Sequence, residues 1–398
     1  MGIEFGPLRD RELDELVHAD LRAFSAGEVP RDLDLRVREG LELDRFLVAR
    51  DEGRIVGNIG AFSMQLTLPG GARVPVCAVT WVAIAATHRR RGLMRRLIEL
   101  VHDEALARRE VAAVLWAAEA SIYPNVGYGP THQLREVAID TRIARLREDA
   151  PTGGRLRYID PSEVVAVQRE LQERLCAVQP GELGRSEEWW RRISLDYEPT
   201  EPNVLVPYAA VHLDDDGVID GIVTYRSTER WDEPRPNHRV EVQEFIAATA
   251  TARSELIGLL LSLDLVGEVR LEVGIDDPLD WILVDPRVAS TIRVADSLWL
   301  RVLDMDGLFG SRTYGDADPV VVDAGALGTW RIGESPRATA AAPDVSMGVG
   351  ELGALSLGGV SATTLVRAGR VVEHRPGAAH RLDVLLASDP PPLCLTHF

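Results

Sequence analysis

The same order of elements is predicted twice along this chain, and this repeat constrains the fold more than any other sequence feature. Residues 45–119 have the pattern of a β-hairpin, a further strand, an amphipathic helix and a buried strand. Residues 203–273 have the same elements in the same order, and a strand and helix at 3–24 precede the first copy. Strand–helix–strand units build α/β sheets covered by helices. We therefore predict two α/β domains that are structural duplicates.

In the first copy, this prediction rests on two turn sequences and on one run of apolar residues at helical spacing. Asp51-Glu52-Gly53 joins two apolar runs, and Pro69-Gly70-Gly71 returns the chain as another strand. Apolar residues then recur at helical spacing from Leu93 to Val101, which predicts a helix that ends near Arg109.

The length of 398 residues exceeds that of one ordinary domain. A polar segment at 148–155 has the composition of a linker, and the last quarter of the chain changes to short alternating and Gly-rich runs. We predict a first domain at 1–146, a second at 147–288 and a smaller α+β domain at 289–398. The strand predicted at 297–305, "SLWLRVLDM", is assigned to the third domain.

The composition excludes several classes of function. With 45% hydrophobic and 27% charged residues, the chain is typical of a globular protein. We find no signal peptide and no run long enough to span a bilayer, so we expect a cytoplasmic protein with no membrane partner. A net charge of −18 argues against nucleic acid as a partner and favours a cationic substrate.

Two residue types narrow the chemistry further. The chain contains no lysine, which excludes a Walker A phosphate loop and Schiff-base chemistry on a lysine. The three cysteines and the scattered histidines have neither metal-ligand nor disulfide spacing. We therefore predict no metal, and a reducing compartment.

Positive charge gathers at one point of this acidic chain, in "VAIAATHRRRGLMRRL" at 82–97. A helix N-terminus offers free N–H groups and a partial positive charge, which together form an anion site. Gly92 would allow the backbone to approach a phosphate closely. A solvated basic helix face or a nucleic-acid patch is the alternative, but the apolar strand before the cluster and the periodic helix after it favour a phosphate site. The arginines that would add charge there are Arg89, Arg90, Arg91 and Arg95.

The order Arg89-Arg90-Arg91-Gly92-Leu93-Met94 resembles the acetyl-CoA pyrophosphate loop of the GCN5-related N-acetyltransferase (GNAT) superfamily, with Met94 where a small residue is usual. Together with "SIYPNVGYGP" at 121–130, it is similar to the Eis (enhanced intracellular survival) acetyltransferases, and the resemblance covers the full length. It implies an α/β (α+β) fold of an active GNAT domain, a degenerate second GNAT domain and a C-terminal domain like sterol carrier proteins. It also implies acetyl-CoA as cosubstrate and a homo-hexamer.

The resemblance carries over to individual residues. Tyr123 would be the general acid and the terminal carboxylate of Phe398 the base. A backbone N–H in the segment 82–84 would stabilise the oxyanion on the thioester. The acceptor would be an amine of a cationic compound, either an aminoglycoside-like small molecule or a lysine side chain. Acetyl-CoA would be bound by Val82, Ala83, Ile84, Arg90, Arg91, Gly92, Leu93, Met94, Arg95, Ala118 and Glu119.

Reference pKa values limit both catalytic roles. A thiol has a pKa of about 8.5 and a tyrosine about 10, so full proton transfer from Tyr123 to sulfur is uphill by roughly 2 kcal/mol. Hydrogen bonding to the departing sulfur is the alternative role. A carboxylate with a pKa near 3.5 is a weak base for an ammonium with a pKa of about 10, so Phe398 must be desolvated, act through water or select the neutral amine.

Each catalytic assignment has a plain structural alternative. Tyr123 alone would be an ordinary loop aromatic, but its position between "AAEASI" and a Pro-Asn-x-Gly turn favours catalysis. Phe398 would be the end of a frayed tail, the usual state of a terminus. The apolar ending "LCLTHF" instead predicts a tail docked on the protein.

Two positions depart from the Eis pattern. His397 stands where an acidic residue helps to bind aminoglycosides in that pattern, and the pocket wall at 23–30, "AFSAGEVP", also differs. An aminoglycoside preference therefore does not follow from the resemblance. Trp81 keeps the aromatic residue that typically lines this pocket.

Other signals are given less weight. A Gly-x-Gly-x-x-Gly run at 348–353 follows no clear strand, so we interpret it as a turn and short helix rather than a dinucleotide site. The run 187–192 is interpreted as a helix that packs its tryptophans rather than as a partner patch. Two other functions stay open, a lipid or hydrophobic-ligand binding protein with a vestigial acetyltransferase, and a regulatory scaffold. The intact Arg–Gly loop and Tyr123 favour the enzyme.

Overall fold

The computed structural model describes residues 2–25, 39–197, 207–232 and 234–398. The chain forms two compact units. Unit 1 comprises Met1–His132, Gln179–Arg192 and Asp296–Phe398, and unit 2 comprises Gln133–Val178 and Ile193–Ala295. Segments that are distant in the sequence therefore fold together in unit 1.

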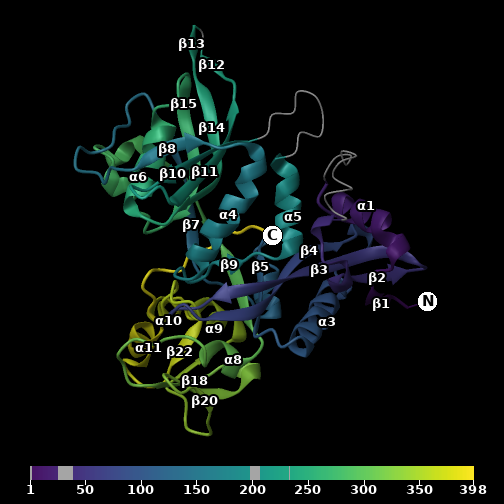
Figure 1. Cartoon of the computed structure of the whole chain (residues 1–398). Coiled ribbons are helices and arrows are strands. Elements are labelled where there is room, and N and C mark those ends of the chain that lie inside the picture. The colour runs from purple at the N-terminus through teal and green to yellow at the C-terminus, as the bar shows by residue number, and fades with distance from the viewer. Residues whose placement is uncertain (1, 26–38, 198–206, 233) are drawn as a thin grey trace. The chain divides into compact units, whose positions relative to one another are not determined.

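One large sheet forms the centre of unit 1 (Figure 1). Its strands, in spatial order, are β1 (Glu4–Pro7), β2 (Leu47–Asp51), β3 (Arg54–Thr67), β4 (Arg73–Ile84), β5 (Ala112–Trp116), β17 (Leu298–Val302) and β6 (Gly129–Pro130), with β9 (Leu183–Gly184) paired to β3. The pair β4–β5 is parallel and is joined by α3 (Leu93–Ala107), whereas the other pairs are antiparallel. Helix α1 (Leu13–Ala23) packs against β3 and β4.

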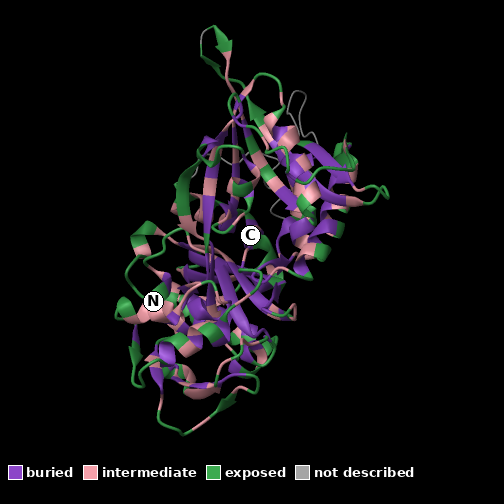
Figure 2. Ribbon diagram, turned by 90° about the vertical axis from the view of Figure 1, so that its left-hand side faces the viewer, coloured by how far each residue is buried: buried purple, intermediate pink, exposed green. Residues whose placement is uncertain are grey.

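The elements predicted for the first copy are confirmed. The β2–β3 turn has Glu52 at φ 50° and Gly53 at φ 80°, the backbone that a two-residue hairpin turn requires. Helix α3 buries Leu93 and Leu97 against the sheet, as its apolar period predicted. A core cluster of unit 1 therefore lies between α3 and the strands β2 to β5. Figure 2 shows buried residues in the interior of the chain and exposed residues mainly in its outer loops.

The strand predicted at 297–305 lies in a different sheet from the expected one. β17 pairs with β5 and β6 in the large sheet, so its assignment to the third domain is wrong. Conversely, β7 (Gln133–Asp140), which falls within the predicted first domain, pairs with a strand of unit 2. An apolar alternation identifies a strand but not the neighbour to which its backbone hydrogen-bonds, so the sequence did not reveal this exchange. The boundaries at 146 and 288 stay predictions.

The C-terminal part of unit 1 adds a small sheet and four helices. The Gly-x-Gly-x-x-Gly run forms the start of α9 (Val349–Leu355) with Gly348 as its N-cap, which confirms the predicted short helix. The expectation that no strand precedes the run is wrong, because the short strand β21 (Val345–Met347) ends directly before Gly348. A Cβ on Gly353 would collide with the carbonyl of Leu300, so these glycines let α9 approach β17 and β6 closely. The other elements are β18 (Val320–Asp323), β19 (Thr329–Ile332), β20 (Arg337–Ala338), β21 (Val345–Met347), β22 (Val371–Glu373), α8 (Met305–Phe309), α10 (Ala362–Arg367) and α11 (Ala378–Leu386).

Unit 2 repeats the element order of unit 1, as predicted. A hairpin of β10 (Tyr208–Leu213) and β11 (Ile219–Thr228) is followed by β14 (His238–Ala247), helix α6 (Ala250–Leu261) and β15 (Val266–Gly274). β14 pairs with β15 in parallel, as β4 does with β5. Its sheet has the order β16 (Ala289–Asp296), β7, β15 (Val266–Gly274), β14 (His238–Ala247), β11 (Ile219–Thr228), β10 (Tyr208–Leu213) and β8 (Arg155–Tyr158). The remaining elements are α4 (Pro161–Cys176), α6 (Ala250–Leu261), α7 (Leu279–Ile282) and the short pair β12 (Trp231–Asp232) and β13 (Arg235–Pro236).

A buried histidine, His212, is linked through Asp220 to the N-cap of α6 in unit 2. His212 Nδ1 lies 2.5 Å from Asp220 Oδ1 and its Nε2 lies 2.9 Å from the carbonyl of Gly153. Both partners are acceptors, so this geometry favours the imidazolium, in which both ring nitrogens donate. Burial lowers the pKa of His212, but the hydrogen bonds to Gly153 and Asp220 and the charge of Asp220 outweigh it and raise the pKa above 6.5. Asp220 also accepts from Thr249, the N-cap of α6.

This ion pair predicts a pH-dependent stability. Because the folded pKa of His212 lies above the unfolded value, its stabilisation is complete below pH 6.5 and is lost as the pH rises through the folded pKa. We expect the unfolding temperature of the wild type to fall between pH 6 and pH 9 by more than that of a His212→Asn variant, as measured by calorimetry. Equal pH dependence in the two proteins would contradict the assignment.

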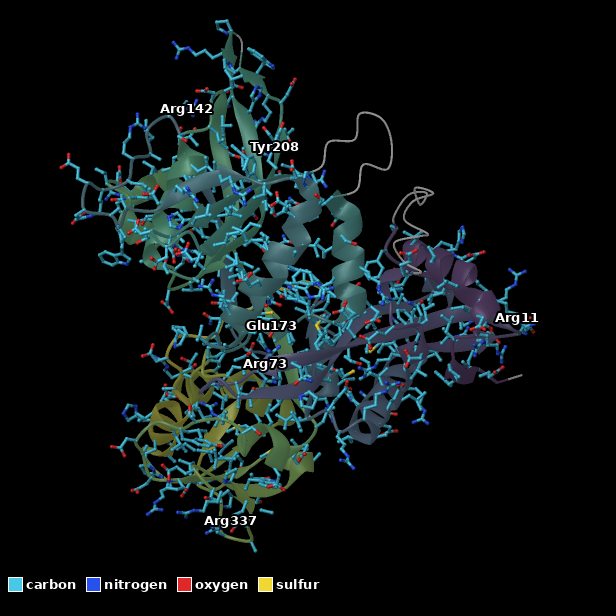
Figure 3. The ribbon with its side chains drawn as sticks, in the orientation of Figure 1. Arg11, Arg73, Arg142, Glu173, Tyr208 and Arg337 are labelled. Atoms are coloured by element: carbon cyan, nitrogen blue, oxygen red, sulfur yellow. The ribbon has the colours of Figure 1, made fainter. Side chains whose placement is uncertain are left out.

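The chain has arginines but no lysine, and its arginine side chains include exposed and buried ones. Arg11 and Arg337 are exposed and extend from their elements in Figure 3. Arg45 is buried in a two-hydrogen-bond ion pair with Glu110, at 2.6 and 2.7 Å. Removing one partner of such a pair leaves an uncompensated buried charge. The pair joins the segment before β2 to the segment before β5, and Arg45 also donates to Ser63 of β3 and to Cys77 of β4.

Candidate active site

Strands β4 and β5 diverge at the centre of the large sheet. Their pairing covers only Val76–Ala78 on β4, although β4 continues to Ile84. A bulge on β4 puts Trp81 at φ 51°, and Asn58 Nδ2 holds its carbonyl at 2.7 Å. The bulge and the end of the parallel pairing leave backbone groups of β4 without a strand partner on the β5 side. This divergence forms one wall of a cavity.

The cavity has a volume of about 680 Å³ and brings together segments from β4, α3, β5 and the C-terminus. Its lining includes all but one of the residues predicted from the sequence, namely Val82, Ala83, Ile84, Arg90, Gly92, Leu93, Met94, Arg95, Ala118, Glu119, Tyr123 and Phe398. The exception is Arg91, which is exposed and lies outside the lining, whereas Arg89 belongs to it.

The N-terminus of α3 opens into this cavity. Gly92 is its N-cap with φ 80°, and the first N–H in the helix that bonds to a preceding carbonyl is that of Arg96, to Gly92 O at 3.1 Å. The N–H groups of the first turn are therefore directed at the cavity rather than used within the helix. Arg90 and Arg95 are exposed beside them, and Leu93 is buried in the core, where it anchors the turn. The arrangement suits an anion with several charges.

Replacement of Gly92 by Val is expected to weaken acetyl-CoA binding at least about tenfold, or 1.4 kcal/mol. A β-branched residue is strained at φ 80° and places methyl groups over the free N–H groups. Gly377→Val is the matched control, because Gly377 is also a helix N-cap, at φ 82°, with equally open surroundings outside the cavity. Calorimetry should give weaker binding for the first variant only, and equal affinities would show that α3 does not bind the coenzyme.

Tyr123 begins a short 3-10 helix, Tyr123–Val126, after β5. It is 6% exposed, its ring is 6.0 Å from that of Tyr128 in an edge-to-face contact, and it lies 6.4 Å from that of Trp299. Burial, and then the charge of Glu119, raise the pKa of Tyr123 above its usual value of 10. The phenol is therefore protonated at neutral pH and is a hydrogen-bond donor, while full transfer of its proton is harder than in water.

The C-terminal tail is docked, as its apolar composition predicted. Cys394 and Thr396 are fully buried, and Phe398 lines the cavity. Trp116 Nε1 donates to Thr396 O at 3.0 Å, and the His397 ring stacks on the indole of Trp116 at 4.0 Å between ring centres. His397 therefore packs on the end of β5.

Sequence reasoning missed several lining residues. Trp116, His88, Ser121 and Asn125 also line the cavity. Each stands within a few residues of a predicted site residue, so adjacency to the Arg–Gly loop or to Tyr123 was the available signal. Of the pocket wall expected at 23–30, Ala23 and Phe24 line the cavity, and residues 26–30 lie outside the described part of the chain.

Within residues 2–25, 39–197, 207–232 and 234–398, no group of three or more His, Cys, Asp or Glu side chains is arranged to hold a metal ion. No helix in the same residues combines the length and the apolar character needed to cross a bilayer.

Family models match three segments of the chain. Residues 4–131 and 181–302 each match an acetyltransferase (GNAT) domain, and residues 317–395 match a sterol carrier protein domain. The predicted fold class, with two GNAT domains and a sterol-carrier-like C-terminal domain, is therefore confirmed.

Known proteins resemble the chain over nearly its full length. An uncharacterized N-acetyltransferase of Streptomyces avermitilis is 35% identical, with 96% of this chain and 97% of that protein covered. N-acetyltransferase Eis of Mycobacterium tuberculosis is 31% identical, with 91% and 89% covered. The crystal structure of Eis1 from Mycobacterium abscessus superimposes with a TM-score of 0.86 at 30% identity, covering all of both chains. The chain is thus an N-acetyltransferase, and it belongs to the Eis-like family of the GNAT superfamily.

Proposed function

We propose that this enzyme transfers the acetyl group of acetyl-CoA to the amine of a cationic acceptor, in the cavity between β4 and β5. One observation carries the proposal: the α3 N-terminus with its arginines, the phenol of Tyr123 and the end of the chain at Phe398 all line this cavity. GNAT enzymes use acetyl-CoA, and the match of residues 4–131 to that domain supports the same cosubstrate here.

In the proposed reaction the coenzyme lies along β4 and its phosphates meet the start of α3. Gly92, Leu93, Met94 and Arg95 offer backbone N–H groups, and Arg90 and Arg95 add charge. Arg91, also predicted to bind the coenzyme, would do so only through a change of its side-chain position. Val82, Ala83 and Ile84 follow the pantetheine arm, and Ala118 and Glu119 flank it from the end of β5.

The amine attacks the thioester carbon directly, so a C–N bond forms while the C–S bond breaks. The Phe398 carboxylate accepts the proton of the amine, directly or through water, and a backbone N–H at 82–84 stabilises the oxyanion. Tyr123 donates a hydrogen bond to the departing sulfur. Its raised pKa supports this role rather than complete proton transfer.

The acceptor is proposed from charge. A protein of net charge −18 attracts cations, so the candidates are an aminoglycoside-like amine or a lysine side chain. His397 stands where the Eis pattern has an acidic residue, so a preference for aminoglycosides is not part of the proposal. A hexamer and a cytoplasmic location remain predictions.

The alternative function, binding of a hydrophobic ligand by the C-terminal domain, has less support. The cavity found there, of about 640 Å³, is lined mainly by polar and charged groups such as Asp316, Arg331, Glu334 and Arg337. Coenzyme release, followed with a thiol reagent across a panel of mono- and polyamines, tests the proposed function. An enzyme that binds acetyl-CoA but releases thiol with none of these amines would contradict it.

We expect one acetyl-CoA per chain. In unit 2 one N–H group of the first turn of α6 is already used, because Thr249 Oγ1 accepts the N–H of Ala252 at 3.0 Å. The helix also begins with "ATATARSEL", without the arginines and glycine of α3. Titration calorimetry that gave two coenzyme molecules per chain would contradict the degenerate assignment of the second GNAT domain.

A further inference from the structure

A fully buried carboxylate outside the cavity contacts the C-terminal tail. Glu182 Oε1 accepts a hydrogen bond from Thr396 Oγ1 at 2.5 Å, and its Oε2 accepts one from the N–H of Leu395 at 3.0 Å. The N–H of Leu183 donates to Oε1 at 3.1 Å. Hydrogen bonds of this kind offset the cost of burying a carboxylate, and two of these three come from the tail.

The backbone of Glu182 is fixed to the large sheet. Thr67 N–H donates to Glu182 O at 3.0 Å, and Leu66 pairs with Leu183 across β3 and β9. β3 is also the antiparallel neighbour of β4, which forms the cavity wall. Glu182 therefore ties the tail to the same sheet that shapes the cavity.

Thr396 connects this carboxylate to a cation. Its hydroxyl donates to Glu182 and accepts from Arg185 Nε at 3.0 Å. The Arg185 guanidinium is 4.2 Å from the ring centre of Trp189 and 5.0 Å from that of Trp190, which orients it. Trp189 and Trp190 are the buried tryptophans of α5 (Glu187–Ser194), as the sequence predicted. These two hydrogen bonds fix the rotamer of the hydroxyl.

Two indole groups hold the last peptide groups before Phe398. Trp116 donates to Thr396 O at 3.0 Å, and Trp189 Nε1 donates to His397 O at 2.8 Å. The direction of the Phe398 carboxylate therefore depends on which tail residue stands opposite Glu182. A slip of one residue would move this carboxylate by about 3.5 Å, which exceeds the range of a hydrogen bond.

We propose that Glu182, acting through Thr396, is a positioning residue that sets the register of the tail and so delivers the Phe398 carboxylate to the reacting amine. This rests on the proposed function, in which that carboxylate is the base. Glu182 is not among the residues that line the cavity, and its hydrogen bonds to the tail go to Leu395 and Thr396. We therefore expect it to act on the orientation of the tail.

Two substitutions and one matched control test the proposal. Glu182→Gln keeps the side-chain shape but replaces one acceptor oxygen by a donor, and Thr396→Val removes the hydroxyl at nearly constant volume. Both are expected to lower kcat about 10- to 100-fold, because a shift of about 1 Å in a reacting group has effects of this size. The KM for acetyl-CoA should stay within about twofold of wild type. Thr396→Ser keeps the hydroxyl and should restore most of the turnover.

A second measurement reports on the tail without using activity. Digestion with a carboxypeptidase, followed by mass spectrometry, should release residues 394–398 faster from Glu182→Gln and Thr396→Val than from wild type or Thr396→Ser. Acetyl-CoA binding by calorimetry shows that each variant is folded.

The two measurements also separate this proposal from the proposed base. If Glu182→Gln had the kcat of wild type and the same resistance to digestion, Glu182 would not be a positioning residue. This conclusion would hold even if an extension of the C-terminus inactivated the enzyme. Faster digestion of Glu182→Gln with unchanged kcat would overturn the positioning role. If a C-terminal extension also left kcat unchanged, the error would lie in the assignment of the Phe398 carboxylate as the base. If Thr396→Ser lost as much turnover as Thr396→Val, the positioning role would also be overturned.

Discussion

A short extension at the C-terminus is expected to abolish turnover while acetyl-CoA binding is retained. The extension converts the Phe398 carboxylate into an amide, which removes the proposed base without removing a side chain. We expect kcat to fall at least about 100-fold, the lower range of the contribution of general base catalysis. Turnover of the extended enzyme, measured by thiol release after its affinity for acetyl-CoA has been checked, gives the result.

The same tag placed before Met1 is the control, and it should be tolerated. Deletion of Phe398 should be equally damaging, because the new carboxylate is withdrawn by about 3.5 Å. The indole contacts of Thr396 and His397 hold the tail in place upstream of this change, so the deletion should not release it. Normal turnover of the C-terminally extended form would exclude the terminal base, and a side chain or water would have to take that role.

Replacement of Tyr123 by Phe is expected to lower kcat at least about tenfold and to change the KM for acetyl-CoA little. The phenol is proposed to contact sulfur mainly as negative charge develops on it, so the lost interaction belongs to the transition state. The ring contacts with Tyr128 and Trp299 do not involve the hydroxyl and should keep the variant folded. Steady-state kinetics at several acetyl-CoA concentrations separate the two constants, and wild-type kcat would remove Tyr123 from the mechanism.

The pH dependence of turnover follows from the direction of the Tyr123 shift. Burial and Glu119 raise its pKa above 10, so the donor form persists through neutral and moderately alkaline pH. Tyr123 should therefore cause no loss of kcat below pH 10. A fall in kcat between pH 8 and 9 that is present in wild type and absent in Tyr123→Phe would contradict this.

Local sequence patterns were sufficient to predict the elements and part of the site. Turn residues located the hairpins and an apolar period located α3, because these features depend on neighbouring residues alone. Helix α6 was predicted from its place between two strand patterns. The Arg–Gly loop was predicted to open a helix, and Gly92 is the N-cap of α3. The order of elements was likewise enough to predict that the two halves have similar folds.

Only the tertiary structure decided which distant segments meet. β17 lies beside β5 instead of in the C-terminal sheet, because strand pairing depends on backbone hydrogen bonds that carry no side-chain signal. The cavity exists because β4 stops pairing with β5 after Ala78, and no periodicity marks that point. Glu182 and Thr396 are 214 positions apart, and the hydrogen bond between them forms only when the chain has closed that loop. The sequence determined the local chemistry of this enzyme, whereas long-range packing brought the end of the chain to the cavity, since a contact between remote residues depends on the whole fold.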